Sequence, residues 1–112
     1  MNAKAQTLLW VAQRASAAVL GLCVLIHLAT MVYAVRGGLT ASEILGRTSG
    51  NAAWFAFYTV FVMAIAVHVP IGLRAVLIEW AGWRSRGRDL ALACFAIYLL
   101  VFGMRAVTAV FR

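Results

Sequence analysis

The chain has 112 residues, of which 65% are hydrophobic and only 12% are charged, and its formal net charge is +7. A soluble domain is about 45–50% apolar and about 25% charged, and a chain this short cannot hide so much apolar surface in its own core. These values exclude a disordered chain, a disulfide scaffold and an ordinary soluble domain. They predict one integral membrane domain over residues 1–112.

Three apolar segments are long enough to cross a bilayer. They run over about 8–35, with an uncharged core at 15–34, then over about 52–80 and 90–111. Each meets the requirement of roughly 20 apolar residues. Lipid offers no partner for backbone polar groups, so each should be an α-helix. The expected fold is therefore an all-α, multi-pass bundle of three transmembrane helices.

The two loops differ in character. The first begins with Gly37 and Gly38 and continues with Thr40 and, three residues later, Glu43. This spacing fits a capping box, which predicts a short helix at the membrane surface, ending before Gly46. The second loop is expected over 81–89 and carries three arginines.

Basic residues stand at the ends of the apolar segments and do not gather on one exposed face, so we expect no nucleic-acid partner. The Lys and Arg count favours a cytoplasmic N-terminus by six to four. This orientation is the one expected for a bacterial inner membrane protein. On the cytoplasmic side lie Lys4, Arg14, Arg74, Arg84, Arg86 and Arg88, and on the other side lie Arg36, Arg47, Arg105 and Arg112.

Both histidines of the chain, His27 and His68, fall inside predicted spans. An ionisable group at membrane depth is costly and indicates a functional site. A neutral imidazole is a common axial ligand of haem iron, so both are candidate metal ligands. The alternative is a hydrogen bond to a neighbouring helix.

The depths of the two histidines favour two haems over one. His27 lies roughly 20 Å along its helix from Arg14, and His68 lies roughly 9 Å from Arg74, at 1.5 Å per residue. The two levels differ by about 10 Å. Each haem would then take its second ligand from another chain.

Arg14 and Arg74 are the next candidate cofactor-binding residues, because both lie one to two turns inside the cytoplasmic edge. A guanidinium there can pair with a haem propionate or donate to a quinone carbonyl. Gln13 and Ser16 add polar groups beside Arg14. The alternative for both arginines is snorkelling to the lipid headgroups.

Two segments resemble motifs of the cytochrome b membrane anchor of succinate dehydrogenase and fumarate reductase. Residues 13–17, Gln-Arg-Ala-Ser-Ala, resemble that family's His-Arg-x-Ser-Gly. Residues 68–74, His-Val-Pro-Ile-Gly-Leu-Arg, resemble its His-x-x-x-Gly-x-Arg-His. Three helices, the chain length and an N-terminus inside are also similar, and the resemblance covers residues 10–80.

The resemblance implies roles for individual residues. His68 matches the haem ligand, Arg14 and Ser16 match the quinone and propionate site, and Arg74 matches the arginine that faces the haem region. His27 is additional to the single-haem members. Its separation from His68 is similar to that in two-haem anchors, where the two helices supply ligands to different haems.

This chain departs from the family's motifs at three positions. Gln13 replaces the motif histidine, Ala17 replaces the glycine, and Ala75 replaces the final histidine. Trp10 stands where a quinone-site serine often lies. The polar stretch that usually precedes the first helix is also missing.

The resemblance implies an anchor that binds haem b and quinone and joins a flavoprotein subunit, an iron–sulfur subunit and a second anchor, or a second copy of this chain. Arg84, Arg86 and Arg88 are expected to meet the acidic surface of the soluble subunits. Two alternatives stay open, namely the anchor of a different cytochrome b oxidoreductase and a structural or transport subunit without haem. A small transport subunit usually needs an acidic residue inside the membrane to couple protons. Transport is therefore disfavoured, because Glu43 lies in a loop and Glu79 at an edge.

Overall fold

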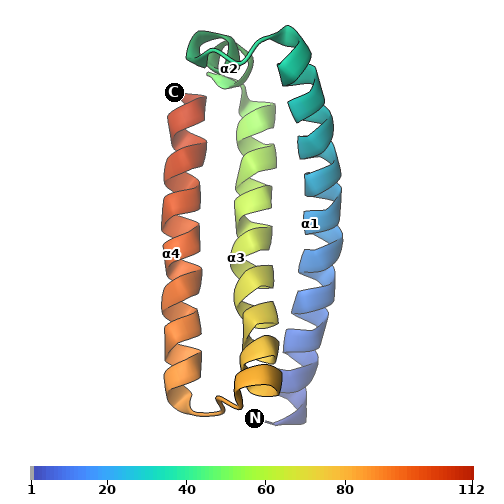
Figure 1. The fold of residues 1–112 in the computed structure, drawn as a ribbon, viewed down its shortest axis with the longest axis vertical. Helices are drawn as coiled ribbons and strands as arrows, with labels where there is room; N and C mark the ends of the chain where they lie inside the picture. The colour runs from blue at the N-terminus through green and yellow to red at the C-terminus, as the bar shows by residue number, and fades with distance from the viewer. Residues whose placement is uncertain (1) are drawn as a thin grey trace.

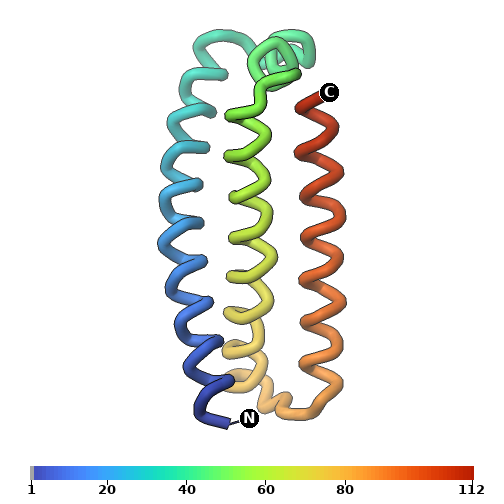
Figure 2. The backbone as a smooth tube through the Cα atoms, turned by 180° about the vertical axis from the view of Figure 1, so that it is seen from behind, coloured from blue at the N-terminus to red at the C-terminus, as the bar shows by residue number. Residues whose placement is uncertain are grey.

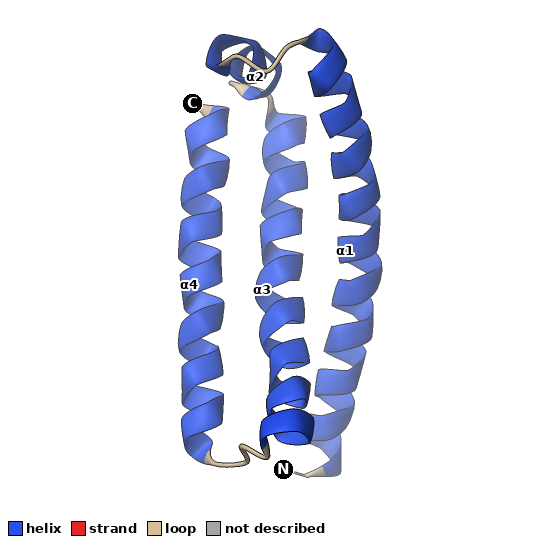
Figure 3. Ribbon diagram, viewed as in Figure 1, coloured by secondary structure: helices blue, strands red, loops and turns tan. Residues whose placement is uncertain are grey.

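The computed structural model describes residues 2–112, which form four helices (Figure 1). They are α1 (Ala3–Gly37), α2 (Ala41–Thr48), α3 (Ala52–Ala81) and α4 (Arg86–Phe111). The three long helices are apolar and long enough to cross a membrane. The described residues contain helices and loops only (Figure 3), so the predicted all-α bundle with three spans is confirmed.

Helix α3 is the centre of the bundle. Helices α1 and α4 run antiparallel to α3 along its two sides, and the views from the front and from behind agree on this order (Figures 1 and 2). The bundle measures 49 × 24 × 22 Å, which matches a bilayer of about 40–45 Å including its headgroup regions. The N-terminus and the α3–α4 turn lie at one end, called the N-terminal end below, and α2 covers the other (Figure 1).

Two helix starts differ from the sequence prediction. Helix α1 begins at Ala3 rather than near residue 8, because the Asn2 side chain accepts a hydrogen bond from the Ala5 amide at 2.8 Å and caps the helix there. Helix α4 begins at Arg86 rather than near residue 90, after Ser85. The loop predicted over 81–89 is therefore shorter, and Arg88 belongs to a helix.

The predicted surface helix exists as α2, with Thr40 as its N-cap. Only the Thr40 half of the predicted capping box forms, because the Glu43 carboxylate pairs with the Thr40 hydroxyl and not with the Thr40 amide. The hydroxyl of Thr40 accepts from the Glu43 amide at 3.2 Å and donates to the Glu43 carboxylate at 2.9 Å. The predicted end before Gly46 is wrong, since α2 continues to Thr48. A glycine within a helix is unfavourable by only about 1 kcal/mol, so Gly46 does not stop it.

The segment after α2 is fastened to the end of α4. The Thr48 hydroxyl donates to the Val110 carbonyl at 2.8 Å, and the Ser49 hydroxyl donates to the Arg112 carbonyl at 2.7 Å. The Gly50 amide donates to the Phe111 carbonyl at 2.6 Å. The final carbonyls of a helix have no partner within it, and residues 48–50 supply three.

Helix packing relies on small residues, as is common in membranes. The buried apolar side chains are few and mostly small: Cys23, Ala34, Ala64, Leu92 and Val107. Most large apolar side chains are exposed, among them Leu25 at 67% and Leu90 at 68%. The bundle thus leaves its apolar surface to lipid or to other membrane chains.

Gly103 allows a close approach between α3 and α4. A Cβ atom added there would lie 2.6 Å from Cγ1 of Val62, whereas one added at Gly21 on α1 would meet nothing within 4 Å. We expect Gly103→Ala to lower the free energy of unfolding by about 1–3 kcal/mol through overpacking, and Gly21→Ala to leave it unchanged or higher. Thermal unfolding of both variants in detergent checks this, and equal midpoints would contradict the packing described.

Candidate functional site

The predicted ligand His68 faces α1, where Ser16 lies opposite. The Ser16 Oγ atom is 3.5 Å from His68 Nδ1, and the Ser16 side chain is buried at 7% exposure. The Ser16 hydroxyl also donates to the Gln13 carbonyl at 3.1 Å. Because this bond uses the hydroxyl proton, Oγ is left to accept from Nδ1–H, which would leave the Nε2 lone pair of His68 free for a metal.

Gln13 lies one turn before Ser16, also against α3. A Cβ atom added at Gly72 would lie 3.1 Å from Gln13 Nε2, so the glycine makes room for the amide. Gln13 Oε1 is buried without a hydrogen-bond partner among the described residues. An unpaired buried acceptor costs about 1–3 kcal/mol, so this seam between α1 and α3 holds an unfilled hydrogen-bonding position next to Ser16 and His68.

His27 also lies between α1 and α3, toward the α2 end. Its ring makes edge contacts with Tyr58 and Phe61, at centroid distances of 6.0 and 5.6 Å. Its Nδ1 atom is buried and has no hydrogen-bond partner within the described chain. The ring lines a cavity of about 460 Å³ that extends under α2 to Arg47 and Trp54. His27 therefore presents a nitrogen that needs a ligand or a hydrogen bond.

The two histidines lie at different levels of the bundle. His68 is level with Ser16, which precedes His27 by 11 residues on α1. At 1.5 Å per residue, the levels are about 16 Å apart. Antiparallel helices α1 and α3 each supply one histidine to the seam they share.

Arg14 and Trp10 lie on another side of α1. The Arg14 guanidinium stacks over the Trp10 ring at 4.6 Å, and both side chains are exposed. Two residues along a helix correspond to a rotation of about 200°, so Arg14 points away from the seam that holds Ser16. The structure brings together Gln13, Ser16 and His68, and it separates them from the pair of Arg14 and Trp10.

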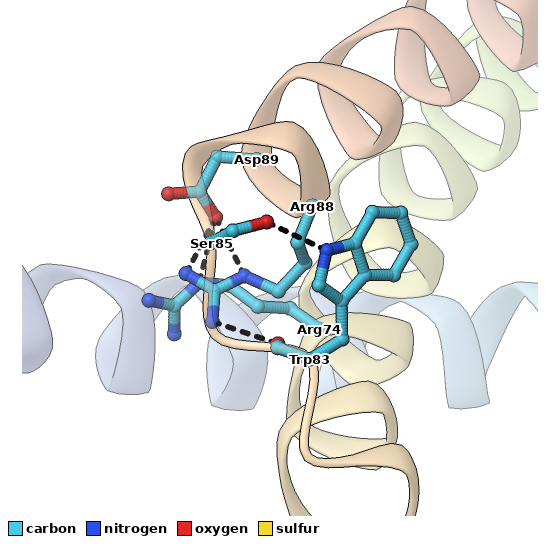
Figure 4. Close-up of polar contacts among 5 residues, drawn as sticks. All are labelled: Arg74, Trp83, Ser85, Arg88 and Asp89. Carbon is cyan, nitrogen blue, oxygen red and sulfur yellow. Dashed lines mark hydrogen bonds and ion pairs between the residues drawn. The ribbon is translucent and has the colours of Figure 1, made fainter.

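Arg74 faces α4, about 120° around α3 from His68. Its Nε lies 3.4 Å from Asp89 Oδ1, and the same oxygen takes Nε and Nη2 of Arg88, both at 2.9 Å. Arg88 also donates to the Trp83 carbonyl at 3.3 Å. Figure 4 shows this cluster, in which the Trp83 indole donates to Ser85 at 2.7 Å.

Arg88 does not take the position expected for it. We expected its side chain to meet a soluble partner, but Arg88 is only 6% exposed and holds the α3–α4 turn together. Sequence reasoning also missed Asp89 as the common acceptor. Asp89 directly follows Arg88 in the sequence, and this adjacency was the available signal.

The fold and these polar groups define a small multi-pass α-helical membrane subunit with most of its apolar surface open to neighbours. The chain belongs to the family described as succinate dehydrogenase/fumarate reductase transmembrane subunit, whose profile matches residues 1–104. Neither the comparison with curated proteins nor that with solved structures gives a match. Membership makes the chain a membrane subunit of an assembly with other subunits.

The buried Arg88 should matter more for stability than an exposed arginine of the same turn. We expect Arg88→Gln to lower the free energy of unfolding by about 2 kcal/mol, because charge-assisted hydrogen bonds to Asp89 and Trp83 are lost. The control Arg84→Gln removes the same charge from an exposed side chain and should change it by less than about 0.5 kcal/mol. Denaturant unfolding in detergent measures both, and equal effects would show that the hydrogen bonds of Arg88 do not stabilise the α3–α4 turn.

Proposed function

We propose that this chain is the membrane anchor of a succinate:quinone oxidoreductase that binds haem b and quinone and passes electrons between the iron–sulfur subunit and the quinone pool. The observation that carries the proposal is His68, held inside the bundle with Nδ1 facing the buried Ser16 hydroxyl. Haem ligands commonly have such a partner on the second ring nitrogen, which fixes the tautomer and the ring orientation.

Both histidines fit a haem. His68 would ligate through Nε2 with Ser16 as its supporting partner. His27 would also ligate through Nε2, and its buried Nδ1 has no such supporting partner among the described residues. When bound, haem b supplies a one-electron carrier inside the bilayer. The residues at two levels favour two haems, each shared with a second anchor subunit or a second copy of this chain that provides the opposing ligand.

The exposed pair of Arg14 and Trp10 supports a quinone site that another chain completes. A guanidinium stacked on an indole is oriented and partly desolvated, and Arg14 can donate to a quinone carbonyl. The structure does not place Ser16 beside Arg14, so we assign Ser16 and Gln13 to the histidine side and Arg14 to the partner-facing side. Arg74 turns to a third face, toward Asp89 on α4.

Soluble subunits would dock at the N-terminal end of the bundle. Arg84 and Arg86 are exposed there, so they can meet the acidic surface of the flavoprotein and iron–sulfur subunits, whereas Arg88 is occupied internally. The excess of basic residues at this end favours a cytoplasmic position in a bacterial inner membrane.

A haem spectrum and the haem-to-chain ratio of the purified native complex test the ligands. We expect two b-type haems, of which His68→Ala loses one and His27→Ala loses the other. One haem, lost only with His68→Ala, would reduce His27 to a packing residue. A colourless complex would refute the haem part of the proposal.

Ser16 should tune the haem bound by His68 without ligating it. We expect Ser16→Ala to weaken haem affinity about 10–100-fold, as loss of a supporting partner does in metal sites, while Ser16→Thr keeps the hydroxyl and the affinity. Titration of the haem-depleted complex with haem, followed by absorbance, measures this. Equal affinities of the alanine variant and the unsubstituted chain would contradict a supporting role.

A further inference from the structure

A groove runs along the side of α3 that neither α1 nor α4 covers. It consists of two neighbouring cavities of about 410 and 400 Å³, which share Val67 as a lining residue. The α3 side extends from Thr59 to Arg74, or about 22 Å at 1.5 Å per residue. We call these joined cavities the trough.

The trough is apolar along its length and polar at one end. Its α1 wall includes Leu9 and Ala15, and its α4 wall includes Ala93. At the N-terminal end of the bundle its lining includes the ion pair of Arg74 and Asp89. This layout suits a molecule with a long apolar part at membrane depth and a polar group at the edge.

The polar end of the trough carries a net positive charge, and Asp89 orients the Arg74 guanidinium there. Asp89 Oδ1 holds Nε of Arg74 at 3.4 Å and also accepts from Arg88, so one carboxylate faces two guanidinium groups and a unit of positive charge remains. The terminal nitrogens of Arg74 have no hydrogen-bond partner within residues 2–112. A guanidinium held through Nε presents these nitrogens as a fork that suits phosphate oxygens.

We infer that the trough binds one anionic phospholipid, with an acyl chain along α3 and the phosphate on Arg74. The uncompensated charge favours an anionic headgroup over the neutral ring of an isoprenoid quinone. A basic opening between transmembrane helices at the cytoplasmic side is the kind of site that binds acidic lipid headgroups. The cation at the end of the groove favours an anionic lipid over an apolar transmembrane helix of a partner, which would leave the remaining positive charge without a counter-ion.

Titration of the purified, delipidated complex with phosphatidylglycerol, followed by native mass spectrometry, tests the inference. We expect one saturable site, with phosphatidylcholine binding at least about tenfold more weakly. This comparison needs no variant, so it stands if a substituted chain fails to assemble. Because both lipids carry a phosphate, equal binding of the two would overturn the inference that the site selects an anionic headgroup.

Four variants locate the site. Arg74→Gln should weaken phosphatidylglycerol binding about tenfold or more, since a charge-assisted hydrogen bond is lost, and Ala93→Leu should do so by filling the groove. The control Arg105→Gln removes the same charge at the opposite end and should have no effect. Asp89→Asn distinguishes the orientation of Arg74 from the net charge of the cluster. It makes the cluster more positive, but it removes the carboxylate that holds Arg74, so we expect weaker binding.

Other results would overturn the inference. Unchanged binding in Arg74→Gln would place the lipid elsewhere, and stronger binding in Asp89→Asn would mean that bulk charge alone attracts it. One-for-one displacement of phosphatidylglycerol by a quinone would make the trough a quinone site. Absence of a saturable site in the complex, together with cross-linking of the Ala93→Cys variant to another subunit, would identify a partner helix as the occupant.

Discussion

The scarcity of water around this chain is the constraint on which its structure depends. Backbone groups at membrane depth must find partners within the chain, which explains three long helices and the placement of irregular backbone at the two ends of the bundle. The same constraint applies to polar side chains. Within the bundle they are concentrated on the seam between α1 and α3, and at the N-terminal end they surround Asp89.

These polar groups fall into two classes, according to whether their buried atoms have hydrogen-bond partners. The cluster of Arg88, Trp83 and Ser85 is internally paired and holds a turn, so its work is structural. The seam, by contrast, leaves Gln13 Oε1 and His27 Nδ1 without partners. Unpaired buried atoms are costly, and in a subunit of a larger assembly they indicate where a cofactor or another chain completes the structure.

Much of the fold followed from sequence, because the spans depend only on length and apolarity and the Thr40 cap depends on three neighbouring residues. The candidate site was harder to predict. Arg14 and Ser16 are close in sequence, yet helical geometry rotates them by about 200°, so one motif serves two faces. The burial of Arg88 could not be predicted without knowing where α4 begins. Because the helix begins at Arg86, a residue expected in the loop lies in the first turn of the helix and is buried.

The connection between residues 48–50 and the last carbonyls of α4 has a consequence for biosynthesis. Thr48, Ser49 and Gly50 leave the ribosome before α3, whereas the carbonyls they satisfy belong to Val110, Phe111 and Arg112. The first two spans can therefore enter the bilayer while this segment still lacks its partners. The hydrogen bonds between residues 48–50 and the end of α4 can form only after α4 has been inserted. Their presence therefore indicates that all three spans are in place.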